Sequence, residues 1–233
     1  DIKQVRRLSS INEFTDRLGE LGIDDLIGVD VEVEPGGPLA QPFAMTDASA
    51  GELSVGNRFC ALPMEGWDGT TDGAPTDLVA RRWRRFGESG AKLVWGGEAV
   101  AVHPDGRANP HQLISSDATT GAIAGLRAGL ETAHREAMGG SDGLLVGLQL
   151  THSGRWSRPE GDPLPQTAHR HTELDRRQGV GAAEVLTDDQ LDELVGRYVV
   201  AAGRAQEAGF DFVDVKHCHG YLLHELLTGV DRP

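Results

Sequence analysis

The sequence has few cysteines, little positive charge and no long apolar run. Cys60 and Cys218 are its only cysteines, and no apolar leader precedes them, which is typical of a cytoplasmic protein without structural disulfides. Lys and Arg number 22 against 36 Asp and Glu, a net charge of -14, and this charge repels nucleic acid and anionic membranes. No apolar run reaches the roughly 18 residues that span a membrane. We therefore expect a cytoplasmic protein that binds neither nucleic acid nor membrane.

The order of apolar segments predicts an α/β fold with a parallel sheet. Runs of strand length alternate with amphipathic stretches of helix length. These runs lie at residues 58–63, 92–95, 144–150 and 212–215. Two shorter apolar segments within residues 42–59 suit a small hairpin before the first main strand. Residues 1–42 lack this regularity and are expected to form an N-terminal extension, with one helical stretch at 11–21.

The helices are predicted from their end signals. The clearest begins after Thr187, where Gln190 completes a capping box, and ends at Gly209. Others are expected at 117–139 and 76–88, with a fourth beginning near Tyr221. Eight β/α units take about 250 residues, so four units predict that residues 43–233 form the first half of a (β/α)8 TIM barrel.

Ionisable residues gather at the predicted end of the fourth strand. Lys216, His217, His219 and Tyr221 follow one another there, at the end of a barrel strand where catalytic groups are found. A metal site built from His217, His219 and His224 is the alternative. Because no acidic or thiolate partner with suitable spacing accompanies them, we expect no metal.

The other strand ends suit a flat ligand. Gln149 closes the third strand, and its amide both donates and accepts, as the edge of a heteroaromatic ring requires; the alternative is that it satisfies neighbouring backbone. The first and second strands end in small or flat backbone segments, where glycine permits close approach: Pro63, Met64, Gly96, Gly97 and Ala99. Residues 155–185 form either an active-site insertion or a disordered surface loop.

Six segments, in this order, resemble the old yellow enzyme family of FMN-dependent reductases over roughly residues 50–230. They are NRFCALPME, DGAPTD, KLVWGGEAVAVHPDGR, GLQLTHSGR, LTDDQLDELVGRYVVAAGRAQEAGFDFVDV and HGYLLHELL. The resemblance implies a (β/α)8 barrel with FMN at its C-terminal mouth. It also implies hydride transfer from NADH or NADPH, through the flavin, to an activated C=C bond of a small molecule.

The resemblance also implies roles for single residues. Positions that lie along the flavin, at its edge or on its pyrimidine ring correspond to Pro63, Met64, Glu65, Ala99 and Gln149. Lys216 and His219 correspond to the pair that grips the substrate carbonyl, and Tyr221 to the proton donor.

The chain departs from the family pattern in three places. Glu65 stands where Thr or Cys is common, and a carboxylate there is expected to disfavour the anionic reduced flavin. Lys216 stands where His is usual. The sequence ends at GVDRP, before the strands that supply the flavin's Arg contact and phosphate site, so we expect a homo-oligomer or a partner chain that completes the barrel. Two alternatives stay open: a flavin-dependent amine or substrate dehydrogenase, and a non-catalytic half-barrel subunit.

Overall fold

The computed structural model describes residues 4–26, 36–47, 51–178, 184–230 and 232. The chain divides into two compact units, Asp1–Gln41 and Pro42–Pro233. The smaller unit contains the predicted helix, α1 (Ile11–Leu21). The Ser10 side chain caps its first turn, and Gly22 ends it in the left-handed region, with φ 65°. The assignment of residues 1–42 and 43–233 as separate domains stays a prediction.

A small hairpin opens the larger unit. Strands β1 (Phe43–Asp47) and β2 (Gly51–Val55) pair antiparallel, with Phe43 opposite Val55. The predicted hairpin is therefore confirmed in its strands, while residues 48–50 of its turn lie outside the described residues.

Four parallel strands form the main sheet. They are β3 (Cys60–Ala61), β4 (Leu93–Ala101), β5 (Leu145–Thr151) and β8 (Phe212–Val215), and their spatial order follows the chain. All four predicted strands are confirmed, although β3 is shorter than expected. Neighbouring parallel strands in chain order are what the first four units of a (β/α)8 barrel require.

Strand β4 extends beyond residue 95, where the sequence pattern predicts its end. Gly96 and Gly97 have positive φ values of 124° and 49°, and the register with β5 shifts between Gly96 and Ala99. The pair therefore forms a bulge, after which the strand continues to Ala101. The sequence pattern indicated a strand end because glycines mark bulges and turns alike.

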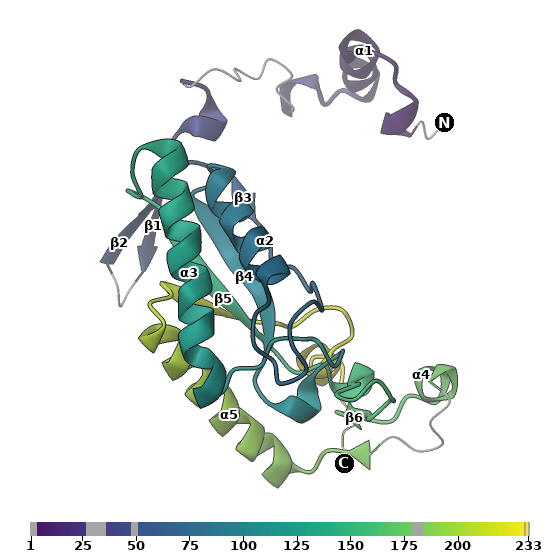
Figure 1. Ribbon diagram of the computed structural model, residues 1–233. Coiled ribbons are helices and arrows are strands. Elements are labelled where there is room, and N and C mark those ends of the chain that lie inside the picture. The colour runs from purple at the N-terminus through teal and green to yellow at the C-terminus, as the bar shows by residue number, and fades with distance from the viewer. Residues whose placement is uncertain (1–3, 27–35, 48–50, 179–183, 231, 233) are drawn as a thin grey trace. The chain divides into compact units, whose positions relative to one another are not determined.

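Three helices pack on one face of the sheet: α2 (Asp77–Glu88), α3 (Asp117–Met138) and α5 (Asp188–Glu207) (Figure 1). The predicted capping box joins Thr187 and Gln190 at the start of α5, and Gly139 ends α3 with φ 79°. The core between helices and sheet is apolar. Its members include Val79, Trp83, Val94, Leu126, Leu130, Val146, Leu148, Leu194 and Ala201.

The opposite face of the sheet is more open. The rings of Trp95 and Phe212 lie 5.3 Å apart there, and Trp95 is 40% exposed. Between them on the sheet stands Gly147, where a Cβ atom would meet the Phe212 ring at 2.3 Å. Only glycine leaves room for this aromatic pair, which occupies the side of the sheet that lines the interior in a closed barrel.

Much of the segment at residues 155–185 is a built structure. It contains β6 (Gln166–Thr167), α4 (Thr172–Arg177) and β7 (Glu184–Val185), while residues 179–183 lie outside the described part. Arg155, 1% exposed, forms ion pairs with Asp175 and Glu225. This arginine ties the segment to α6 (Leu222–Leu226).

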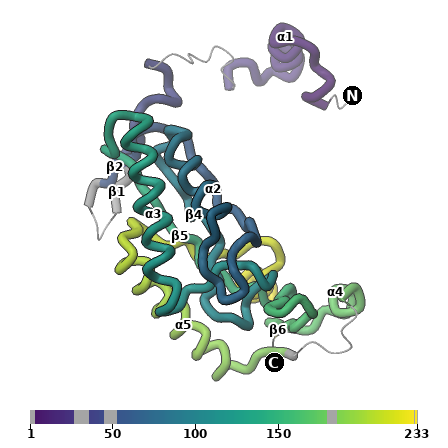
Figure 2. The backbone as a smooth tube through the Cα atoms, viewed as in Figure 1, coloured from purple at the N-terminus to yellow at the C-terminus, as the bar shows by residue number. Residues whose placement is uncertain are grey.

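The C-terminal segment lies beside β6, as Figure 2 shows. Arg232 donates hydrogen bonds to the carbonyl oxygens of Ala168, at 2.9 Å, and Leu186, at 2.5 Å. For the described part of residues 155–185, these bonds and the Arg155 ion pairs disfavour a disordered loop.

Among the described helices, none has the length and apolar character that a bilayer crossing requires.

Candidate functional site

The site begins where the first two strands end. The amide of Met64 donates to the Gly97 carbonyl at 3.1 Å, and the amide of Ala99 donates to the Met64 carbonyl at 3.0 Å. These bonds carry the parallel pairing of β3 and β4 past the bulge. The backbone that precedes Glu65 is therefore fixed against the rigid strand β4.

A compact cluster of side chains joins the ends of β3 and β8, the first and fourth strands of the main sheet. Lys216 forms an ion pair with Glu65 Oε1, and the Tyr221 hydroxyl donates to Glu65 Oε2 at 2.8 Å. The Lys216 Nζ also lies 4.3 Å from the centroid of the Tyr221 ring. Lys216 and Tyr221 are 3% and 7% exposed. Three predicted site residues are thus brought together, and Glu65 is bonded to both others.

Tyr221 is held in its protonated form. Its pKa lies well above the ordinary value because burial disfavours the phenolate, and because the Glu65 carboxylate repels that charge and accepts the hydroxyl hydrogen bond. At neutral pH the phenol therefore keeps its proton, which is the state a proton donor needs.

His219 lies at the edge of this cluster. It has φ 63°, an uncommon conformation for a residue other than glycine, and its ring meets the Tyr221 ring edge-on at a centroid distance of 6.1 Å. Its side chain is exposed, unlike that of Lys216. The two predicted carbonyl-gripping residues therefore flank Tyr221 in different environments.

The three histidines of the metal alternative have separate contacts. His217 Nδ1 lies 2.7 Å from the Val215 carbonyl, and His224 Nδ1 accepts from the Gly220 amide at 2.8 Å. Within the described ranges, no three His, Cys, Asp or Glu side chains are grouped as metal ligands. The metal alternative therefore gains no support.

Gln149 finds its partner on the neighbouring strand. Its Nε2 donates to Asp214 Oδ2 at 2.6 Å, and the two residues face each other in the β5–β8 register. The observed partner is therefore a side chain rather than the backbone. Among the described residues nothing donates to Gln149 Oε1, which leaves that oxygen open to a ligand N–H. Sequence reasoning missed Asp214, although its spacing of two from Lys216 on a strand was a signal for one shared face.

Ala99 and Pro63 differ in what they offer to a ligand. Ala99 has no exposed surface, and its carbonyl accepts from Gln112 Nε2 at 3.0 Å. Both backbone polar groups of Ala99 are therefore paired. Pro63 is half-buried and Met64 is 48% exposed, so these two present apolar surface. The predicted flavin contact of each residue stays a prediction.

A second charged network, which the sequence did not predict, fixes the loop that follows Glu65. Arg82 on α2 bonds Glu98 at 2.6 Å and both carboxylate oxygens of Asp68 at 2.7 and 2.9 Å. Glu98 also accepts from the Gly66 amide at 3.0 Å. Burial raises the pKa of Glu98, and its hydrogen bond from Arg82 opposes that rise. The network anchors the residue next to Glu65.

The groups present fit a flat heteroaromatic cofactor such as FMN. A Cβ at Gly96 would lie 2.9 Å from the Gln149 side chain, so the β4 backbone lies flat against the residue that offers an open amide oxygen. Exposed Met64 supplies apolar surface for a ring face, and Gln149 supplies a polar atom for a ring edge.

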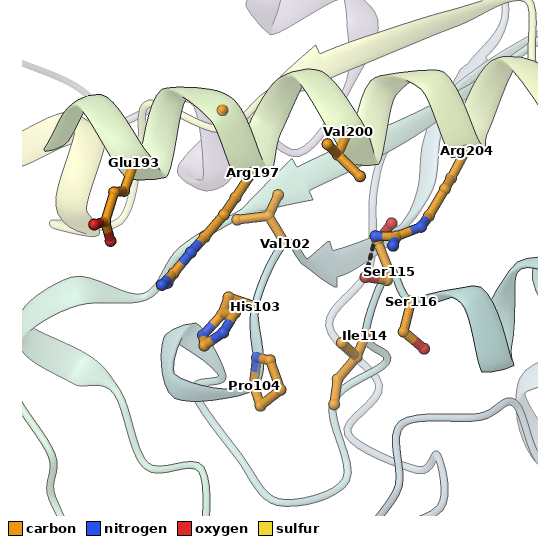
Figure 3. Close-up of a pocket in the computed structure, with 11 residues that line it drawn as sticks. Val102, His103, Pro104, Ile114, Ser115, Ser116, Glu193, Arg197, Val200 and Arg204 are labelled. Atoms are coloured by element: carbon orange, nitrogen blue, oxygen red, sulfur yellow. Dashed lines mark hydrogen bonds between the residues drawn. The ribbon is translucent and has the colours of Figure 1, made fainter. Parts of the chain in front are cut away.

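A cavity of about 600 Å³ lies elsewhere, against α5 (Figure 3). Its lining includes His103, Ser115, Glu193, Arg197 and Arg204. Arg204 donates to the Ser115 carbonyl at 3.1 Å and to Asp117 at 2.7 Å. The cavity contains none of the predicted site residues, so we place the site at the strand ends, where the cluster of Glu65, Lys216 and Tyr221 lies.

Comparison with known proteins gives a consistent family. The family model described as NADH:flavin oxidoreductase / NADH oxidase matches residues 46–231. An NADPH dehydrogenase of Bacillus velezensis is 36% identical over 191 residues, which cover 82% of this chain and 51% of that protein. An NADPH dehydrogenase of Bacillus subtilis is 30% identical over the same shares.

Solved structures agree in fold. The old yellow enzyme from Trypanosoma cruzi has a TM-score of 0.59 at 25% identity, over 80% of this chain and 52% of that one. The old yellow enzyme homologue from Zymomonas mobilis has a TM-score of 0.60 at 24% identity, over 79% and 49%. The chain thus spans about half the length of these relatives, and its fold is part of their (β/α) barrel. This chain belongs to the NADH:flavin oxidoreductase / NADH oxidase family.

Proposed function

We propose that this chain supplies one half of the active site of an FMN-dependent oxidoreductase. The enzyme moves hydride from NADH or NADPH, through FMN, to an activated C=C bond of a small molecule. The observation that carries the proposal is the cluster of Glu65, Lys216 and Tyr221, which joins the ends of β3 and β8, together with the open oxygen of Gln149 on β5.

Each residue has a role in that reaction. Pro63 and Met64 would lie along the flavin with Ala99 at its edge, and Gln149 Oε1 would accept an N–H of its pyrimidine ring. Bound FMN would supply the hydride. Lys216 and His219 would hold the substrate oxygen as negative charge develops on it, and Tyr221 would give a proton to the substrate carbon.

The open face of the sheet supports a proposal about assembly. Trp95 is 40% exposed on that face, and exposed aromatic surface favours contact with another part of a protein. We propose that this face is covered either by a second copy in a homo-oligomer or by a chain that supplies the second half of the barrel. Cys60 and Cys218 are free and exposed, which fits our proposal of a reducing cytoplasm.

Two other functions have some support. A flavin-dependent amine or substrate dehydrogenase is favoured by Glu65, because its carboxylate, which accepts a hydrogen bond from the Tyr221 hydroxyl, can act as a base. A non-catalytic half-barrel subunit is supported by the exposed face around Trp95, which suits a surface that another chain covers. Bleaching of the flavin by NADPH favours reduction of a C=C bond, and bleaching by substrate favours the dehydrogenase.

FMN titration tests the proposal at the level of binding. The quenching of flavin fluorescence is measured on the purified chain, on Gln149→Ala and on Gln206→Ala, which changes an exposed glutamine of α5. We expect Gln149→Ala to raise Kd roughly tenfold, because one buried hydrogen bond is lost, and Gln206→Ala to leave it unchanged. A chain that binds FMN only after a partner chain is added favours the half-barrel subunit. No binding under either condition contradicts the proposal.

A further inference from the structure

Glu65 lies between a buried phenol and the solvent. Its side chain is 16% exposed, whereas that of Lys216 is 2% exposed and Tyr221 as a residue is 7% exposed. Of the three, Glu65 therefore has the best access to water. Its two oxygens have separate partners, Lys216 on Oε1 and the Tyr221 hydroxyl on Oε2.

The Tyr221 hydroxyl donates one hydrogen bond to a carboxylate. The hydroxyl carries a single proton, and that proton lies in the 2.8 Å bond to Glu65 Oε2. Among the described residues, no other carboxylate and no imidazole accepts from this hydroxyl, and His219 contacts the Tyr221 ring edge-on, at a centroid distance of 6.1 Å. The Ser153 hydroxyl also interacts with the Tyr221 hydroxyl but is fully buried, so the route from Tyr221 towards solvent runs through Glu65.

The charged and titratable groups around Tyr221 come from three places. Glu65 comes from the loop after β3, Lys216 from the end of β8, and Cys218 and His219 from the turn before α6. Lys216 Nζ lies 4.3 Å from the ring centroid, where its positive charge favours a transient phenolate. The same ammonium balances the carboxylate, so the cluster holds one cation and one anion around a neutral phenol.

We infer that Glu65 is a positioning residue that relays the proton between Tyr221 and solvent, while Lys216 balances its charge. This inference rests on the proposed function, in which Tyr221 protonates the substrate carbon. The phenol O–H bond breaks as the new C–H bond forms. Glu65 then takes a proton from hydronium and passes it to the phenolate, which restores the phenol and the carboxylate. No electrons move in these steps.

Tyrosine titration by nuclear magnetic resonance tests the relay without flavin. The chain has two tyrosines, so Tyr198→Phe leaves Tyr221 as the single signal of protein labelled with ¹³C at the tyrosine ring carbon that bears the oxygen. The pKa of Tyr221 is measured in this background, with Glu65→Gln, and with Glu136→Gln as a control that removes an exposed carboxylate from α3. We expect Glu65→Gln to lower the pKa by about one unit or more, and Glu136→Gln to leave it unchanged.

Glu65→Asp separates a proton partner from a purely structural contact. It keeps the carboxylate, so the Tyr221 pKa should stay closer to that of the parent than in Glu65→Gln. If Glu65→Gln does not fold, Glu65→Asp decides alone, and it should hold the pKa above the ordinary tyrosine value of about 10. Equal pKa values in Glu65→Gln and Glu136→Gln overturn the inference, as does an equal fall in the Asp and Gln variants. Failure to bind FMN would count against the proposed function and would leave this titration unaffected.

Discussion

The helix-covered face of the main sheet and the carboxyl ends of its strands differ in the interactions that stabilise them. The side covered by helices is closed by apolar packing among α2, α3 and α5, whereas the carboxyl ends of the strands hold buried charges tied to one another across long stretches of sequence. Apolar packing tolerates the exchange of one apolar side chain for another of similar volume, but it is sensitive to a change in volume. A buried ion pair is instead sensitive to the loss of one partner, because the charge that remains is buried and unpaired, which destabilises the fold. Stability on the helix side therefore depends on side-chain volume, whereas stability at the strand ends depends on keeping each buried charge paired.

The largest expected effect is at the strand ends. Arg155→Ala leaves the carboxylates of Asp175 and Glu225, 8% and 7% exposed, without their cation. We expect the free energy of unfolding to fall by about 3 to 5 kcal/mol, measured by urea denaturation. Arg176→Ala is the control, because its pair with Glu173 is exposed and contributes less than about 0.5 kcal/mol. Similar losses in both variants would contradict the contrast.

A smaller effect is expected on the helix side, where α2 and α3 approach closely. A Cβ at Gly87 would lie 2.2 Å from the Leu130 carbonyl oxygen, so Gly87→Ala forces the helices apart. We expect a loss of about 1 to 3 kcal/mol in the same urea experiment. Gly129→Ala, where nothing lies within 4 Å, should instead gain about 0.5 to 1 kcal/mol. A stabilised Gly87→Ala would show that volume does not limit this packing.

Loss of a helix cap should have a still smaller effect. The Thr187 hydroxyl accepts from the Gln190 amide at 3.2 Å, at the exposed start of α5. Thr187→Ala should lower the free energy of unfolding by about 1 kcal/mol, whereas Thr187→Ser should retain most of it. Thermal unfolding of the three proteins makes the measurement, and a Ser variant as unstable as the Ala variant would argue against the cap.

The smallest expected effect is a pH dependence on the helix side. Burial lowers the pKa of His134, and its hydrogen bond to the Gly87 carbonyl opposes that shift. The unfolded chain, with an ordinary histidine pKa of about 6.5, therefore binds more protons than the folded chain as pH falls below that value. The free energy of unfolding should therefore fall as the pH decreases from about 6.5 through the lowered pKa of the folded-state His134. His134→Gln should flatten the slope relative to the parent, and parallel slopes would assign the pH dependence to other groups.

The helix side could be predicted from the sequence better than the site. Its signals are local: the capping box at Thr187, the glycine after Met138 and the apolar runs of the four strands. Parallel strand ends also predict that Lys216 and Tyr221 lie at one mouth. The pairing of Glu65 with Lys216, separated by 151 residues, depends on register and rotamers that no local pattern encodes. The Arg155 ion pairs could not be predicted for the same reason, whereas the bulge at Gly96 was missed because glycines mark bulges and turns alike.

The most direct test of the account is the near-ultraviolet and visible absorbance of the purified protein with FMN, followed through addition of NADPH and then of an α,β-unsaturated carbonyl compound. The account predicts flavin bands that bleach with NADPH and return with the unsaturated compound. Bound flavin that neither NADH nor NADPH bleaches would contradict it.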